Sequence, residues 1–108
     1  MEARDNRGKK VAQVARQMGA ELRKQARKSW TGVVTAERNE GDRHVWRFRS
    51  PADGSERFLH LPHREMVQGD SATLLQQLEA GRWTDRLSSG SGNAIILSEG
   101  GLQAYPMN

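Results

Sequence analysis

The sequence predicts one α+β domain whose helices pack on one face of an antiparallel sheet. Residues 9–28 contain no proline and repeat apolar side chains at helical spacing. Residues 29–61 hold three segments of strand-like composition separated by turn-like sequences, and a second helical segment and a hairpin follow. The predicted order of elements is αβββαββ, which is typical of the α+β class. A small half-open β-barrel built from the same five strands, with helices, is the alternative.

Length and composition restrict the classes of protein that this chain can belong to. Its 108 residues suit a single domain, and we expect a flexible N-terminus over residues 1–8 followed by one domain over residues 9–108. The absence of cysteine excludes disulfides, thiolate zinc sites and thiol enzymes. The longest apolar run, AIIL at residues 94–97, is far shorter than the ~20 residues that cross a bilayer. We therefore expect a cytoplasmic protein without a membrane partner.

The predicted first helix, residues 9–28, has two chemically different faces. With successive residues about 100° apart, one arc of the helix is apolar and the opposite arc is cationic. The apolar arc consists of Val11, Val14, Ala15, Met18, Leu22 and Ala26. The cationic arc consists of Lys9, Lys10, Arg16, Arg23, Lys24, Arg27 and Lys28. Such a helix docks by one side and presents charge with the other.

Charge is distributed unevenly along the chain. Residues 1–30 contain nine Lys and Arg against three acids, a net charge of +6, although the whole chain carries only +4. Residues 31–108 contain the remaining eight Lys and Arg against ten acids, a net charge of −2. Positive charge concentrated in one segment indicates an acidic partner for that segment.

The central part of the sequence predicts a three-stranded meander over residues 29–38, 44–50 and 57–61, with turns at 39–42 and 51–56. Alternation places Trp46, Phe48 and Phe58 on one face. The other face receives Val45, Arg47, Arg49, Arg57 and Leu59. We interpret the aromatic face as core rather than as a platform on which unpaired bases stack, because a chain with six aromatic residues needs them inside. The three arginines would then extend the basic surface, provided that their face is uncovered.

The C-terminal part predicts a second helix and a hairpin. Residues 71–80 form the helix, with Asp70 or Ser71 as N-cap and Gly81 just after its end. Trp83 and Leu87 continue the core. Residues 88–93, SSGSGN, form a flexible loop, and the last strands turn at residues 99–101.

Residue patterns give no support to catalysis or metal binding. His44, His60, His63 and Glu65 offer nitrogen and oxygen atoms, but they match no established metal motif. We interpret the histidines as ordinary surface or half-buried residues. The SSGSGN loop has neither the lysine nor the following helix of a phosphate-binding P-loop. We expect no cofactor, no metal and no enzymatic activity.

The sequence is consistent with two functional hypotheses. The favoured one is a non-enzymatic nucleic-acid-binding or nucleoprotein accessory protein that contacts the phosphates of DNA or RNA. Its binding residues would be Lys9, Lys10, Arg16, Arg23, Lys24, Arg27 and Lys28, with Arg47, Arg49 and Arg57. The alternative is a protein-interaction module, such as an adaptor, an inhibitor or a small subunit. In that case the apolar arc of the first helix pairs with a partner or with a second copy in a homodimer, and the cations select an acidic protein surface.

Overall fold

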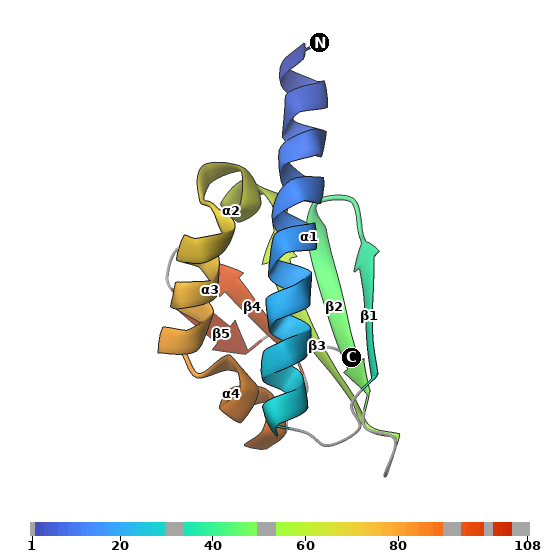
Figure 1. The fold of residues 1–108 in the computed structure, drawn as a ribbon, viewed down its shortest axis with the longest axis vertical. Helices are drawn as coiled ribbons and strands as arrows, with labels where there is room; N and C mark the ends of the chain where they lie inside the picture. The colour runs from blue at the N-terminus through green and yellow to red at the C-terminus, as the bar shows by residue number, and fades with distance from the viewer. Residues whose placement is uncertain (1, 30–33, 50–53, 90–93, 99–100, 105–108) are drawn as a thin grey trace.

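The computed structural model describes residues 2–29, 34–49, 54–89, 94–98 and 101–104 (Figure 1). Within these ranges the elements, in chain order, are α1 (Glu2–Ser29), β1 (Val34–Asn39), β2 (Arg43–Arg49), β3 (Glu56–Pro62), α2 (His63–Gln68), α3 (Ser71–Ala80), α4 (Trp83–Ser89), β4 (Ala94–Ser98) and β5 (Gly101–Ala104). None of the helices in the described part of the chain is long and apolar enough to span a membrane.

The five strands form one open sheet in the order β1-β2-β3-β4-β5. Helices α1 to α4 all lie on the same face of this sheet (Figure 1). The predicted α+β class and the αβββαββ framework are therefore confirmed, and the half-open barrel is wrong. One pairing differs from the prediction. β3 pairs with β4 in parallel, so the sheet is mixed rather than wholly antiparallel. A parallel pair requires a long crossover, which α2, α3 and α4 supply.

Two short helices and one helix boundary differ from the predictions. Helices α2 and α4 were not predicted, because segments of six and seven residues are too short to show a clear helical period. Helix α1 begins at Glu2 rather than at Lys9. The flexible N-terminus over residues 1–8 stays a prediction, and the structure shows residues 2–8 as helical. The predicted loop over residues 88–93 begins inside α4, and residues 90–93 lie outside the described ranges.

Helix α1 docks on the sheet through the predicted apolar arc. All six arc residues are buried: Val11, Val14, Ala15, Met18, Leu22 and Ala26. They share one core cluster with Trp46 and Phe48 of β2 and with Leu59 and Leu61 of β3. The two alanines and the buried Gly19 keep this side of the helix narrow, so that its axis comes close to the strands. The apolar arc therefore belongs to the protein's own core.

A hydrogen-bonded glutamine fixes α1 against α3 and α4. Gln25 accepts a hydrogen bond from Nε1 of the buried Trp83 at 2.8 Å. Its own amide nitrogen donates to Glu79 at 3.0 Å and to Glu21 at 3.3 Å. These contacts join three helices through one side chain, because an amide group both donates and accepts. The rotation of α1 about its axis is thus set by polar contacts as well as by the apolar arc.

The second predicted helix is confirmed as α3, with the predicted cap. The carboxylate of Asp70 accepts a hydrogen bond from the backbone nitrogen of Thr73 at 2.8 Å, which satisfies one free donor of the first turn. Gly81 ends the helix as predicted. It is needed there for space, because a Cβ atom at Gly81 would lie 2.6 Å from Cδ1 of Leu102 in β5.

The predicted faces of the third strand are wrong. Cross-strand pairing sets Trp46 opposite Leu59 and Phe48 opposite Arg57, so Leu59 and Arg57 lie on the helix-covered face. Phe58 pairs with Arg47 and lies on the uncovered face instead. The segment RFLHL carries large side chains on both sides, so its alternation alone does not identify the inner face. Trp46 and Phe48 are confirmed as core residues, each 1% exposed.

Candidate nucleic-acid interface

The outer face of α1 carries the seven cations predicted for the first helix: Lys9, Lys10, Arg16, Arg23, Lys24, Arg27 and Lys28. Five of them are exposed, whereas Lys10 and Arg23 are half-buried. Because the apolar arc is fixed in the core, the outer face cannot turn inward. Residues 12, 13, 17 and 20, which lie between the cations, are alanines and glutamines and are exposed. We define the outer face of α1 by the seven cations.

The cations of the outer face are spread along a straight support. At about 100° per residue, Lys9, Arg16 and Arg27 fall within about 20° of one line along the helix. At about 1.5 Å per residue, that line is about 27 Å long. Lys24 and Lys28 lie to one side of it and Arg23 to the other. The helix of 28 residues is about 42 Å long, close to the 46 Å longest dimension of the molecule. In Figure 1 its first turns project beyond the sheet.

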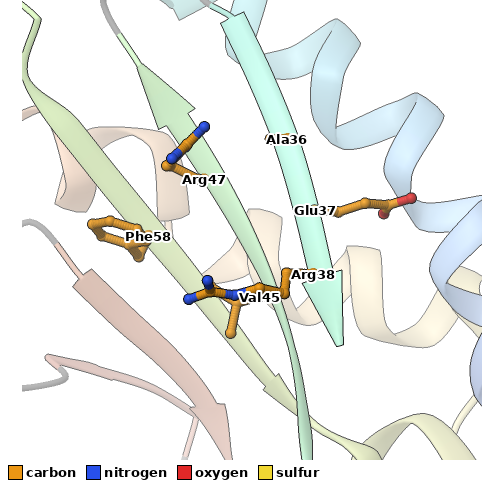
Figure 2. Close-up of a pocket in the computed structure, with 6 residues that line it drawn as sticks. All are labelled: Ala36, Glu37, Arg38, Val45, Arg47 and Phe58. Carbon is orange, nitrogen blue, oxygen red and sulfur yellow. The ribbon is translucent and has the colours of Figure 1, made fainter. Parts of the chain in front are cut away.

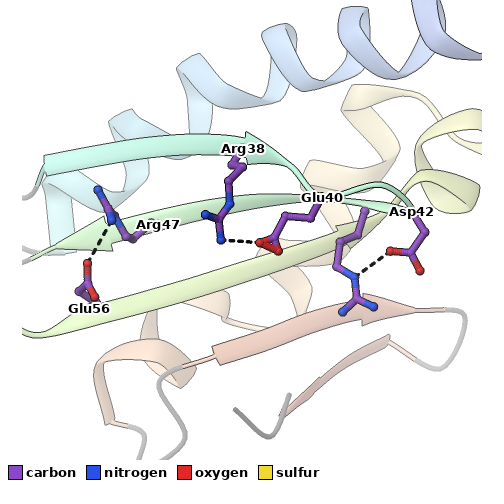
Figure 3. Close-up of polar contacts among 6 residues, drawn as sticks. Arg38, Glu40, Asp42, Arg47 and Glu56 are labelled. Atoms are coloured by element: carbon purple, nitrogen blue, oxygen red, sulfur yellow. Dashed lines mark hydrogen bonds and ion pairs between the residues drawn. The ribbon is translucent and has the colours of Figure 1, made fainter. Parts of the chain in front are cut away.

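Four arginines outside α1 form ion pairs with carboxylates. Arg38 pairs with Glu40, Arg43 with Asp42 at 3.1 Å, and Arg47 with Glu56 at 3.4 Å (Figure 3). Arg64 lies 3.6 Å from Glu65. Across the described residues, none of the seven cations of the outer face forms an ion pair with a carboxylate. The outer face of α1 thus differs from the uncovered sheet face, where Arg38 and Arg47 each pair with a glutamate.

The structure separates Arg47, Arg49 and Arg57 from the outer face of α1. Arg47 and Arg49 lie on the sheet face that the helices leave uncovered, so the whole sheet stands between them and α1. Arg57 lies on the helix-covered face, where its Nε donates to the backbone oxygen of Leu87 at 3.0 Å and its Nη1 to Ser55 at 2.9 Å. Arg57 therefore does not share a face with Arg47 and Arg49, and the assignment of these three arginines to nucleic-acid binding stays a prediction.

A pocket of about 270 Å³ lies on the uncovered sheet face (Figure 2). Val45 and Phe58 supply apolar surface, and Arg38 and Arg47 lie beside them. Ala36 and Glu37 of β1 complete the lining, although the Glu37 side chain points toward α1. Both arginines already pair with carboxylates. The pocket thus combines a small apolar floor with balanced charge, and it is separate from the outer face of α1.

Trp46, Phe48 and Phe58 do not form a shared aromatic platform on which unpaired bases could stack. Trp46, Phe48 and Trp83 are each 1% exposed, and Phe48 packs against Trp83 with ring centroids 5.3 Å apart. Phe58 is half-buried and lies on the uncovered face of the sheet. Trp30 and Tyr105 lie outside the described residues. Among the described aromatic residues, none lies on the outer face of α1.

The histidines are placed at three different sites. His44 in β2 lies against Trp46, with ring centroids 4.6 Å apart, and its Nε2 lies 3.1 Å from Oε2 of Glu37. His60 is buried in β3 on the uncovered face, and His63 begins α2. In the described ranges, no three of the His, Asp and Glu side chains come close enough together to hold a metal ion.

Burial lowers the pKa of His60 below its usual value of 6.5, and the nearby Arg43 guanidinium lowers it further. The folded state therefore resists protonation at a pH at which the unfolded chain accepts a proton. Titration of His60 leaves the free energy of unfolding unchanged above pH 6.5. It lowers that free energy as the pH drops from 6.5 toward the lower folded-state pKa. The H60Q variant lacks this titrating group. We therefore expect the substitution to lower the free energy of unfolding less at pH 5 than at pH 7.5. Urea unfolding at both pH values measures the difference, and an effect of H60Q that is equal at both would contradict it.

The role of Gln25 was not predictable from local sequence patterns. Its contacts with Trp83 and Glu79 join residues more than 50 positions apart, and no local pattern identifies such a pair. The balanced charge of the uncovered face was also not predicted, because the partners Arg47 and Glu56 meet only through strand pairing.

Comparisons of the chain with protein-family models, with curated proteins and with solved structures found no match.

Proposed function

We propose that this protein binds nucleic acid without catalysing a reaction, and that the outer face of α1 contacts the phosphate backbone. The charge of the outer face supports this most strongly: among the described residues none of its seven cations forms an ion pair with a carboxylate, whereas four of the eight arginines outside α1 do. A row of cations releases the counterions condensed on a nucleic acid, and this release drives binding. The alanines and glutamines between the cations are neutral, so they add no negative charge that would repel a phosphate backbone.

The protein-interaction alternative relied on the apolar arc of α1. That arc is buried against the protein's own sheet, so it is not available to a partner or to a second copy. A homodimer would have to use a different surface. An acidic protein as the partner of the cations remains the competing proposal, and counterion release distinguishes it from a nucleic acid.

Fluorescence anisotropy of a labelled 20-base-pair DNA duplex, titrated with the full chain over a series of salt concentrations, tests the proposal. Five exposed cations predict that log affinity falls with log salt with a slope of about −4.5, at about −0.9 per phosphate contact. The same series with an RNA duplex separates the two kinds of nucleic acid. Failure to bind either duplex at low salt would refute the proposal, as would an affinity that salt leaves unchanged.

A further inference from the structure

We infer that the outer face of α1 selects double-stranded over single-stranded nucleic acid. The inference rests on the proposed function and specifies its substrate class. It depends on the shape of the cationic surface, on its charge spacing and on the placement of the aromatic side chains.

The cationic surface of α1 is rigid. The line from Lys9 to Arg27 is about 27 Å long and is held by the buried arc and by Gln25. A duplex has a persistence length of about 500 Å, so it lies along such a line without losing conformational freedom. A single strand is flexible and must be ordered over the same length, which costs conformational entropy.

Within the described chain, the outer face of α1 offers a single strand no aromatic contact that would offset its ordering cost. Proteins that bind single strands offset the ordering cost by stacking bases on aromatic side chains, at about 1–3 kcal/mol per base. Of the aromatic side chains that the structure describes, Trp46, Phe48 and Trp83 are in the core. Phe58 lies on the opposite face of the sheet from α1. Within the described chain, the outer face therefore offers phosphate contacts alone.

The higher charge density of a duplex also favours it over a single strand. Each phosphate contact contributes a salt slope of about −0.9 on duplex DNA and about −0.7 on a single strand. For five exposed cations, lowering the salt from about 1 M to about 0.1 M therefore raises the affinity for the duplex by about tenfold more than the affinity for the single strand. Counterion release thus favours the duplex as the salt is lowered, and the ordering cost of the single strand adds to this preference.

The test compares a 20-base-pair duplex with each of its separated strands by fluorescence anisotropy at 0.1 M salt, in a DNA series and an RNA series. We expect the duplex to bind at least tenfold more tightly than either strand in at least one series. A single strand that binds as tightly as the duplex in both series would overturn the duplex inference while leaving phosphate binding intact. Binding to neither form would instead refute the proposed function itself, so the two failures are distinguishable.

Discussion

Replacing Arg16, Lys24 and Arg27 by glutamine is expected to weaken binding to a DNA duplex by several hundredfold at 0.1 M salt. All three side chains are exposed on α1 and lack a carboxylate partner among the described residues. Each lost phosphate contact costs about eightfold in affinity at this salt concentration, from a slope of about −0.9 per contact. The slope itself should fall from about −4.5 to about −1.8. Anisotropy titrations at several salt concentrations measure both quantities.

A variant with the same change in net charge serves as the control. Arg38, Arg64 and Arg82 are exposed and lie outside α1, on β1, on α2 and just before α4. Their replacement by glutamine removes three positive charges, and the surface ion pairs of Arg38 and Arg64 contribute little to stability. We expect this control to bind nearly as tightly as the wild type. Equal losses in the two variants would show that net charge, and not the outer face of α1, determines binding.

Replacing Leu22 by alanine is expected to destabilise the fold by about 3 kcal/mol, because it leaves a cavity between α1 and the sheet. Leu22 is 0% exposed and belongs to the core cluster. Small domains have about 5–15 kcal/mol of total stability, so this is a large loss. Urea unfolding followed by circular dichroism measures it. Gln17→Ala on the exposed side of the same helix is the control, and we expect it to change stability by less than about 0.5 kcal/mol.

The same variant distinguishes a docked α1 from a helix that serves as an interaction surface. If the apolar arc paired with another copy, Leu22→Ala would dissociate a dimer and leave the stability of the monomer nearly unchanged. Light scattering at the concentration of the unfolding experiment reports the oligomeric state. A stable, folded monomer in place of a wild-type dimer would contradict the structure's placement of the arc in the core.

The features that could be predicted from the sequence are those set by local periodicity. In α1, six apolar residues recur at helical spacing, and all six are buried as predicted. In α3, Asp70 marks the start of the helix, because its cap acts within one turn, and Gly81 stands at the predicted end. The cations of α1 follow from the same helical period, so their outward placement was also predictable.

The features that could not be predicted depend on contacts between distant segments. The face of Phe58 is set by the pairing of β3 with β2 and β4, and β3 has large side chains on both faces. The parallel pairing of β3 with β4 depends on a crossover of three helices, two of which are too short to predict. Arg57 was predicted to lie on the open face because the two faces of β3 were predicted the wrong way round. In the structure its guanidinium contacts the backbone of α4.

An NMR titration of the ¹⁵N-labelled protein with an unlabelled 12-base-pair DNA duplex shows directly whether nucleic acid contacts the outer face of α1. We expect the largest shift changes at the exposed positions of α1 between Lys9 and Lys28 and at their arginine Nε groups. We expect small changes for β2 and β3, whose uncovered face lies on the far side of the sheet from α1. Shift changes concentrated around Arg47, Phe58 and the pocket of Figure 2, with α1 unaffected, would contradict binding at the outer face.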